Sequence, residues 1–257
     1  MQQAMKGKWP LSFVLILLVA CSAWAQDEGE TEIMRNLMNS IARTGLSDAV
    51  PYYSVSNREE AKVEGSVLLD QEWKEGRVLK ANGELYRIVG RYNTQADEIQ
   101  IKVGDDIRAI YPDRVRAASL GNQIFVPKAF EAEEHGLKLG FFELLVEGEA
   151  SLLKRYSPTT RKTDYHPVLG STSDNVEIVI HEEYYYQLAG KQAEKLKRTR
   201  SGVLEALRRK RNAVNEYARD NHVGWKKEDD LKLLFAKHNE LVVQSEERAR
   251  VREEEDQ

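Results

Sequence analysis

The sequence predicts an α+β fold in which an antiparallel β meander, curled into a sandwich or a partly open barrel, carries an N-terminal helix and a C-terminal helical hairpin. Two patterns support this fold class. Between about 61 and 156, apolar and polar residues alternate and tight-turn residues recur at short intervals, as in antiparallel sheets. After about 200, apolar residues recur every three or four positions, as in amphipathic helices.

The first 25 residues have the pattern of an export signal. Lys6 and Lys8 precede the apolar run 11–20, and small residues follow it, which is the order found in secretory signal peptides. The run is shorter than the roughly 18 residues that a membrane-spanning helix needs. We therefore expect an exported protein, located in the periplasm or at the outer membrane.

This signal offers two processing sites. Cleavage after Ala25 would use the small residues of Ala23-x-Ala25 and leave Gln26 as the N-terminus, and we prefer this interpretation. The alternative is Leu18-Val19-Ala20-Cys21, which resembles a bacterial lipobox and would place a lipid on Cys21. Because Cys21 is the only cysteine, the chain can form no intramolecular disulfide, and cleavage after Ala25 would leave no thiol for catalysis or for a metal.

An N-terminal segment, 26–60, separates the signal from the predicted sheet. Apolar residues between Ile33 and Ala42 at helical spacing predict a short amphipathic helix from about 29 to 44. Gly45 then ends this helix, as glycine commonly does. The helix is expected either to dock on the main body or to act as a stalk.

The antiparallel β domain is predicted over 61–156, with six to eight short strands. The segment 97–103 alternates apolar and polar residues as a half-buried strand does, and Asn82-Gly83 is a hairpin signal. Residues 140–156 are expected to form a central hairpin. The positions of this hairpin predicted to face the core are Phe142, Leu144 and Val146.

The remainder is predicted to be mainly helical. Residues 157–176 contain proline, glycine and a polar cluster, which predicts a loop or linker. Strands then resume, and within 177–244 they lead into a helical hairpin whose first helix is capped by Ser201 and whose second helix begins near Lys227. The charged tail 245–257 is expected to fray as helix or to be disordered.

No catalytic, nucleotide-binding or zinc motif is recognisable in the sequence. The nearest approach to a metal or acid–base cluster is His181-Glu182-Glu183, but on a strand only His181 and Glu183 share a face, and hydrolytic zinc normally has three protein ligands. Glu131–His135 is a comparable polar segment. A solvated strand edge and a polar turn are the simpler interpretations, so we predict no catalytic residue, no metal and no cofactor.

Two surfaces are candidates for binding. On a strand, Tyr184 and Tyr186 share one face and could present aromatic rings to a sugar or a peptide, although rings packed between sheet and helices are the simpler interpretation. Segment 191–212 holds nine Lys or Arg residues and two Glu, enough to attract acidic lipid, polysaccharide or an acidic partner. The simpler interpretation is a solvated helix face neutralised by the acidic tail. The most basic run of this segment is Arg208, Arg209, Lys210 and Arg211.

Between 65 and 242, the turn, strand and cap residues occur in a distinctive order and spacing. They are Gly65-Ser66-Val-Leu-Leu69, Trp73, Gly76, Arg91-Tyr92-Asn93, the segment from Gly140 to Gly148, Leu152-Leu-Lys-Arg-Tyr156, Tyr184-Tyr185 and Lys226-Lys-Glu-Asp-Asp-Leu231. In this order and spacing the chain resembles a group of exported proteins of Bacteroidota whose function is uncharacterised. The resemblance implies a shared fold and export, and it implies no catalytic residue.

Together these observations predict an exported cell-envelope protein that binds or scaffolds and is not an enzyme. One alternative is a hydrolase of envelope polymers that uses carboxylates which the sequence does not pair. Another is a membrane-surface module that uses segment 191–212. The expected partner is an envelope protein or polysaccharide. A net charge of −4 and export both disfavour nucleic acid, and membrane contact is expected only through a lipid on Cys21 or through the basic segment.

Overall fold

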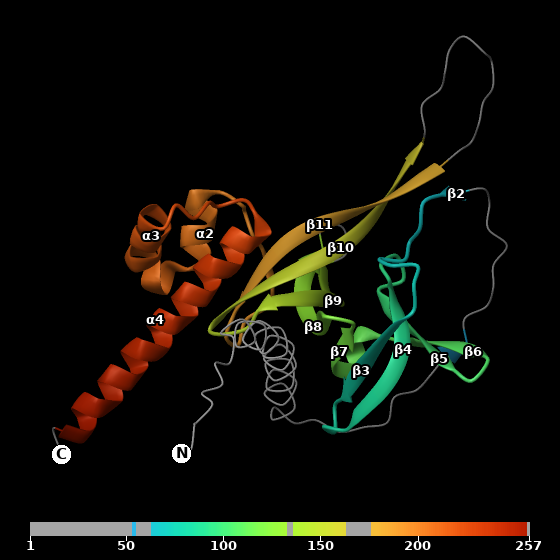
Figure 1. Ribbon diagram of the computed structural model, residues 1–257, viewed down its shortest axis with the longest axis horizontal. Coiled ribbons are helices and arrows are strands. Elements are labelled where there is room, and N and C mark those ends of the chain that lie inside the picture. Colours follow the sequence, from blue (N-terminus) through green and yellow to red (C-terminus); the bar gives the residue numbers. More distant parts are fainter. Residues whose placement is uncertain (1–52, 55–62, 133–135, 163–175, 256–257) are drawn as a thin grey trace, which may run out of the picture. The chain divides into compact units, whose positions relative to one another are not determined.

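The computed structural model describes residues 53–54, 63–132, 136–162 and 176–255 (Figure 1). The export signal, with Cys21, Ala25 and Gln26, lies outside these residues, as does the helix predicted at 29–44. Within the described ranges, the chain forms an antiparallel sheet followed by three α-helices. The predicted antiparallel β class is therefore confirmed, and so is the change to helix near residue 200.

Nine strands of five or more residues make up most of the sheet. They are β3 (Lys74–Lys80), β4 (Leu85–Asn93), β5 (Glu98–Val103), β6 (Asp106–Ile110), β7 (Val115–Leu120), β8 (Gln123–Ala132), β9 (Gly136–Val146), β10 (Ala150–Lys162) and β11 (Val176–Leu188). The two-residue strands are β1 (Tyr53–Ser54), β2 (Val63–Glu64) and β12 (Glu194–Lys195). The order is β1-β6-β5-β4-β3-β7-β8-β9-β10-β11-β12, while β2 pairs in parallel with β11.

The N-terminal part of the sheet curls around a core of its own. β6 is joined to β7 through a short 3-10 turn, η2 (Pro112–Arg114), yet β5, β4 and β3 lie between these two strands in the sheet. So short a connection requires the sheet to bend until β6 and β7 approach each other. The sheet nevertheless stays open, because the described strands include no β6–β7 pair. The side chains buried in this curled core come from β3 to β10: Val78, Tyr92, Ile99, Ile101, Ile110, Val115, Ala118, Leu120, Phe125, Phe141 and Tyr156.

The helices are α2 (Arg200–Ala206), α3 (Arg211–Asp220) and α4 (Glu228–Glu255), with a 3-10 turn, η3 (Arg208–Lys210), between the first two. The predicted hairpin of two helices is therefore wrong, since its first helix is broken. Thr199, two residues earlier than the predicted Ser201, caps α2, because its hydroxyl accepts a hydrogen bond from the backbone N–H of Gly202 at 3.2 Å. The break lets α2 and α3 turn separate apolar faces toward one core.

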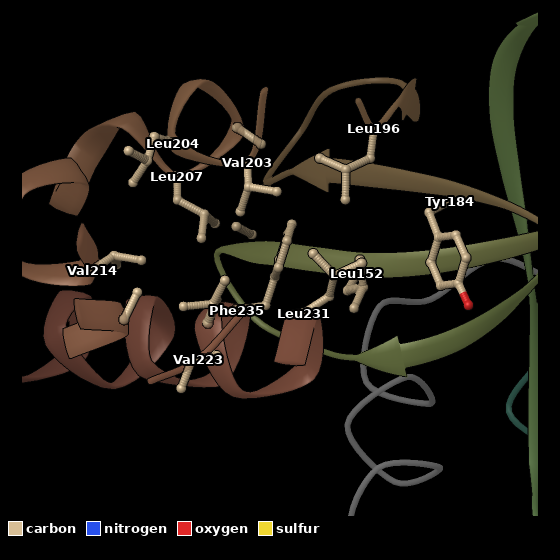
Figure 2. Close-up of a cluster of buried hydrophobic side chains, with 14 residues drawn as sticks. Leu152, Tyr184, Leu196, Val203, Leu204, Leu207, Val214, Val223, Leu231 and Phe235 are labelled. Atoms are coloured by element: carbon tan, nitrogen blue, oxygen red, sulfur yellow. The ribbon is translucent and has the colours of Figure 1, made fainter. Parts of the chain in front are cut away.

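A second core lies between these helices and the sheet. Figure 2 shows Leu152 of β10 and Tyr184 of β11 beside Leu231 and Phe235 of α4. Its opposite wall is completed by Val203 and Leu204 of α2, by Leu207 at the C-terminal cap of α2, and by Val214 of α3. α4 continues to Glu255, so the part of the charged tail that is described is helical. Residues 246–254 are exposed, as expected for a helix that is polar on every side.

The hairpin of β9 and β10 forms where the sequence predicts it, but its side chains alternate differently. Phe142 is completely buried, whereas Leu144 and Val146 are only half-buried. Leu152 lies opposite Val146 and Leu153 lies opposite Leu144, so Leu145 is an extra residue in β9. Such a β-bulge interrupts the two-residue alternation, which is why the predicted core face changes after Glu143.

The predicted loop at 157–176 begins later than expected, because β10 extends to Lys162. Pro158 lies within this strand, opposite Ile180 of β11. Among the described residues, β10 is paired on one side only beyond Lys154, and such an edge position is where a strand tolerates proline. The sheet is therefore continuous across the boundary that the sequence suggested near 156.

No helix within the described ranges is both long enough and apolar enough to cross a membrane.

Candidate functional site

A pocket of about 900 Å³ lies between the distal parts of β8 and β9 on one side and those of β10 and β11 on the other. Its volume is in the range of about 300–1,000 Å³ that is typical of small-molecule sites. The segment 192–195 completes the wall, because Ala193 donates its N–H to the carbonyl of Ala129 in β8 at 2.8 Å. The other lining residues are Phe130, Glu131, Ala132, Lys138, Arg155, Ser157, Pro158, Glu183 and Tyr185.

Two aromatic rings, Phe130 and Tyr185, line the apolar side of the pocket, and the fully buried Phe142 packs behind them. The Phe142 ring lies 5.3 Å from Phe130 and 5.1 Å from Tyr185, and both pairs are edge-to-face. The guanidinium of Arg155 lies 4.4 Å from the centre of the Phe130 ring, a favourable position for a cation over an aromatic face. Arg155 therefore covers part of this apolar side and is itself part of the lining.

Arg155 is held from the other side by Asp97, which belongs to the turn between β4 and β5. Arg155 Nη2 donates to Asp97 Oδ2 at 3.0 Å, and Arg155 Nη1 donates to the carbonyl of Phe141 at 3.2 Å. Asp97 Oδ1 in turn accepts from the Tyr92 hydroxyl at 2.7 Å and from the Phe141 N–H at 3.1 Å. These two side chains thus bind the backbone of β9 at the point where β10 diverges from it.

Gly140 makes this arrangement possible. A Cβ atom at this position would lie 2.3 Å from Arg155 Nη1 and 2.6 Å from Asp97 Oδ2. Any other residue would therefore displace the Asp97–Arg155 ion pair. The backbone conformation of Gly140 does not itself require glycine, because its φ is not in the left-handed region. Glycine is required here for a close approach of neighbouring groups, which is one of its recurring uses within strands.

Charges of both signs alternate around the pocket. Lys195 Nζ lies 2.5 Å from Glu183 Oε1, and Arg155 is directly opposite Glu183 in the pairing of β10 with β11. Glu194 accepts a hydrogen bond from the Tyr186 hydroxyl at 2.6 Å. The charged lining residues are Glu131, Glu183 and Glu194 with Lys138, Arg155 and Lys195, so the described lining has no net charge.

A buried ion network lies on the opposite face of β10. Lys154 Nζ is 3.2 Å from Glu143 Oε2 and 2.9 Å from Glu228 Oε2, and the Tyr156 hydroxyl also donates to Glu143. Glu228 also accepts from the Tyr184 hydroxyl at 2.8 Å. The network therefore links the first turn of α4 to β9, β10 and β11.

The shifted pKa values of this network describe an ion pair that stays charged. Burial opposes the charged form of Lys154, but its hydrogen bond to Glu228 and the charge of Glu143 outweigh burial and raise the pKa well above its usual range. Burial likewise opposes ionisation of Glu228, yet hydrogen bonds from Lys232, Lys154 and Tyr184 lower its pKa to about 2. Burial and the bond to Glu228 raise the pKa of Tyr184 to about 12. At neutral pH, Lys154 and Glu228 are therefore charged and Tyr184 is protonated, which suits a structural role and not acid–base catalysis.

His238 and Asn239 attach α4 to the turn between β9 and β10. The Asn239 side chain accepts from the Ala150 N–H at 3.0 Å and donates to the carbonyls of Ala150 and Glu147 at 3.0 and 3.2 Å. Because its oxygen also faces His238 Nδ1 at 3.3 Å, the neutral imidazole carries its proton on Nδ1. His238 Nε2 then faces Glu149 Oε2 at 3.8 Å, and both atoms are buried without a hydrogen bond.

Protonation of His238 is expected to destabilise the fold. Burial lowers the pKa of His238 below 6.5, and Arg209 and Lys210 of η3 lower it further, while Asn239 and Glu149 oppose this shift. The unfolded chain therefore binds a proton at higher pH than the folded chain does, so stability falls as the pH falls below about 6.5. Urea unfolding between pH 7.5 and 5.5 would measure this slope. The slope should be smaller in His238→Gln, and an equal slope in both proteins would contradict the assignment.

The structure places the sequence-predicted binding residues in different surroundings. Tyr184 is buried in the helical core and Tyr186 is half-buried beside Glu194, whereas Tyr185 lines the pocket. In the basic run, Arg209 pairs with Glu246 at 2.9 Å and lies 3.8 Å from Glu149. The neighbouring residues of the run are Arg208, Lys210 and Arg211, of which the two arginines are exposed.

The polar clusters noted in the sequence lie close to the pocket. Glu183 lines the pocket, while His181, on the same face of β11, lies 2.7 Å from the Thr159 hydroxyl. Glu131 also belongs to the lining, and His135 lies outside the described residues. Over the ranges that the structure covers, no three His, Cys, Asp or Glu side chains gather as metal ligands.

The sequence does not mark Asp97, Gly140 or Arg155 as candidate site residues. The signals that could have found them are weak: an acidic residue in a tight turn, a glycine inside a strand, and a cation where a strand should alternate. Their association depends on the curl of the sheet, which local patterns do not encode.

Comparison with known proteins gives no further assignment: no protein-family model, no curated protein and no solved structure matches this chain.

Proposed function

We propose that this is an exported cell-envelope protein that works by binding a ligand in the pocket between β8 and β11. The observation that carries the proposal is the fixed position of the polar lining. Arg155 is held by Asp97, by the Phe141 carbonyl and by the Phe130 ring, while Glu183 is held by Lys195. Groups that are held before binding lose little conformational entropy when a ligand arrives.

Export and envelope location rest on the signal pattern in residues 1–25 and on the resemblance to exported proteins of Bacteroidota. The amphipathic helix predicted at 29–44 would then connect the pocket-bearing body to the processed N-terminus. If processing occurs at Cys21, this segment becomes a stalk between lipid and body. If it occurs after Ala25, the helix is available to dock.

Hydrolysis of envelope polymers is a weaker proposal. Two buried or half-buried carboxylates, Glu143 and Glu228, are brought together, but Lys154 lies between them where a hydrolase needs water or substrate. A general acid needs a raised pKa, whereas the pKa of Glu228 is lowered to about 2. The geometry of this pair therefore favours a structural role.

Membrane attachment through the basic segment is also weaker. Arg209 is engaged by Glu149 and Glu246, so the charge of the Arg208–Arg211 run is partly neutralised within the protein. Binding to anionic liposomes that is lost with added salt and on neutralising this run would favour the membrane proposal over the pocket.

Filling the pocket is expected to abolish ligand binding. Ser157 is half-buried in the wall, so Ser157→Trp should occupy the space, whereas Thr160→Trp on the exposed opposite face of β10 should not. Retention of each purified protein on isolated envelope polysaccharide and on envelope membranes would be compared, with thermal unfolding as a check of folding. Retention lost only in Ser157→Trp supports the proposal, and equal retention of both variants contradicts it.

A further inference from the structure

We infer that the ligand of this pocket is an uncharged carbohydrate, one or two sugar rings of a longer or free glycan. This inference rests on the proposed function of the pocket. It concerns the chemistry that the lining recognises, and three features of the lining carry it: its charge pattern, its small apolar area and the engaged backbone around it.

The charge pattern disfavours an ionic ligand. Glu183 faces Arg155 across the β10–β11 pair and contacts Lys195 at 2.5 Å, so opposite charges alternate over short distances. The described part of the lining therefore offers no patch of one sign to complement an anion or a cation. A hydroxyl group, by contrast, donates to a carboxylate and accepts from an ammonium or guanidinium at once. Neighbouring hydroxyls on a sugar can therefore use both members of each pair.

The apolar part of the lining has the size of a sugar face and not of a lipid chain. Phe130 and Tyr185 are 5% and 6% exposed, and Pro158 lies beside them in the lining. Only a small part of each side chain is thus available to a ligand. An apolar area this small can cover a few C–H groups of one pyranose ring but not an acyl chain, whose burial is favourable in proportion to the apolar area removed from water.

Recognition of an extended peptide by strand addition is disfavoured by the backbone around the pocket. Side chains of Asp97 and Arg155 occupy the N–H and carbonyl of Phe141, and the Ala193 N–H is bound to β8. Tyr185 in β11 is paired with Lys195 of β12. A peptide that binds as an added strand needs open backbone groups along an edge. Among the described strands that line the pocket, β10 beyond Lys154 has such an open edge, and Pro158 removes a backbone donor from it.

The test measures direct binding of defined probes by isothermal titration calorimetry. The probes are neutral disaccharides (cellobiose, maltose and N,N′-diacetylchitobiose), digalacturonic acid as the matched anionic sugar, and the dipeptide Ala-Ala. At least one neutral disaccharide should bind more tightly than digalacturonic acid and Ala-Ala. Glu183→Gln should weaken that binding by about tenfold or more, since it removes a charged hydrogen-bond acceptor.

Glu177→Gln is the matched control, because Glu177 lies on the same strand, pairs with the exposed Arg161 and is outside the lining. It should bind the disaccharide as the parent protein does, and thermal unfolding should show that both variants are folded. Preferential, Glu183-dependent binding of digalacturonic acid or Ala-Ala would overturn the carbohydrate inference and leave the pocket proposal standing. Sugar binding that survives Ser157→Trp, or no binding of any probe, would overturn the inference; the first result would also remove the pocket as the ligand site.

Discussion

Replacing Lys154 by alanine is expected to destabilise the protein by about 3–5 kcal/mol, the usual cost of removing one partner from a buried ion pair. Lys154 is 7% exposed and lies between the carboxylates of Glu143 and Glu228. Without its ammonium group, two negative charges would remain near each other in a poorly hydrated place. Urea unfolding at pH 7.5 would measure the loss through the shift of the unfolding midpoint.

Lys232→Ala is the matched control for this prediction. Lys232 also contacts Glu228, at 2.7 Å, but its side chain is 38% exposed and is one helical turn away. Its removal should cost no more than about 0.5 kcal/mol, as for other exposed pairs of this spacing. If the two alanine variants lose similar stability, the Lys154 network is not the buried link described above.

Replacing Phe142 alone by alanine is expected to lower the free energy of unfolding by about 3–5 kcal/mol, because removal of a large buried ring leaves a cavity. Phe142 is completely buried between Phe130 and Tyr185, with the Arg155 guanidinium 5.3 Å from its ring centre. The substitution removes the support of both pocket-lining rings. Stability would be measured by urea unfolding and, in the same protein, the near-ultraviolet circular dichroism of the tyrosines should change.

Leu137→Ala provides the comparison on the same strand. Leu137 is 66% exposed, so its truncation should change stability by no more than about 0.5 kcal/mol. A similar loss in both variants would mean that β9 contributes through its backbone and not through the Phe142 ring.

Local sequence patterns predicted the strands better than they predicted the faces of those strands. Alternation located the hairpin around Glu147–Glu149, but it assigned Leu144 and Val146 to the core. Leu144 and Val146 are only half-buried for two reasons that an alternating pattern does not reveal. Leu145 is an extra residue in β9, and both faces of this strand are buried over 140–143. A strand covered on both sides no longer shows which face is inside.

The helical region shows a similar limit. The helical periodicity predicted the apolar stripes correctly, but it did not predict the turn at Arg208–Lys210. The spacing of Leu204, Leu207 and Val214 suits one continuous helix. The break depends on how α2 and α3 share the core with α4. Such tertiary packing overrides local propensity when several elements compete for one apolar surface.

The candidate site was the least predictable part of the molecule. Tyr185, on the face of β11 opposite Tyr184 and Tyr186, lines the pocket. Arg155 pairs with Asp97, whereas its neighbour Lys154 pairs with Glu143 in the buried ion network. In one strand, neighbouring cations point to opposite sides. Their partners come from a turn at Asp97 and from a helix at Glu228, at sequence distances that no local motif covers.

The face of β10 that carries Leu152, Lys154 and Tyr156 has a consequence for how the protein unfolds. Leu152 belongs to the helical core, Tyr156 to the curled core, and Lys154 lies between them. Because β10 supplies side chains to both cores, loss of this strand would open both of them. The described residues between 65 and 242 are therefore expected to unfold as one cooperative unit. Fragments cut anywhere between the two cores should therefore fail to fold alone.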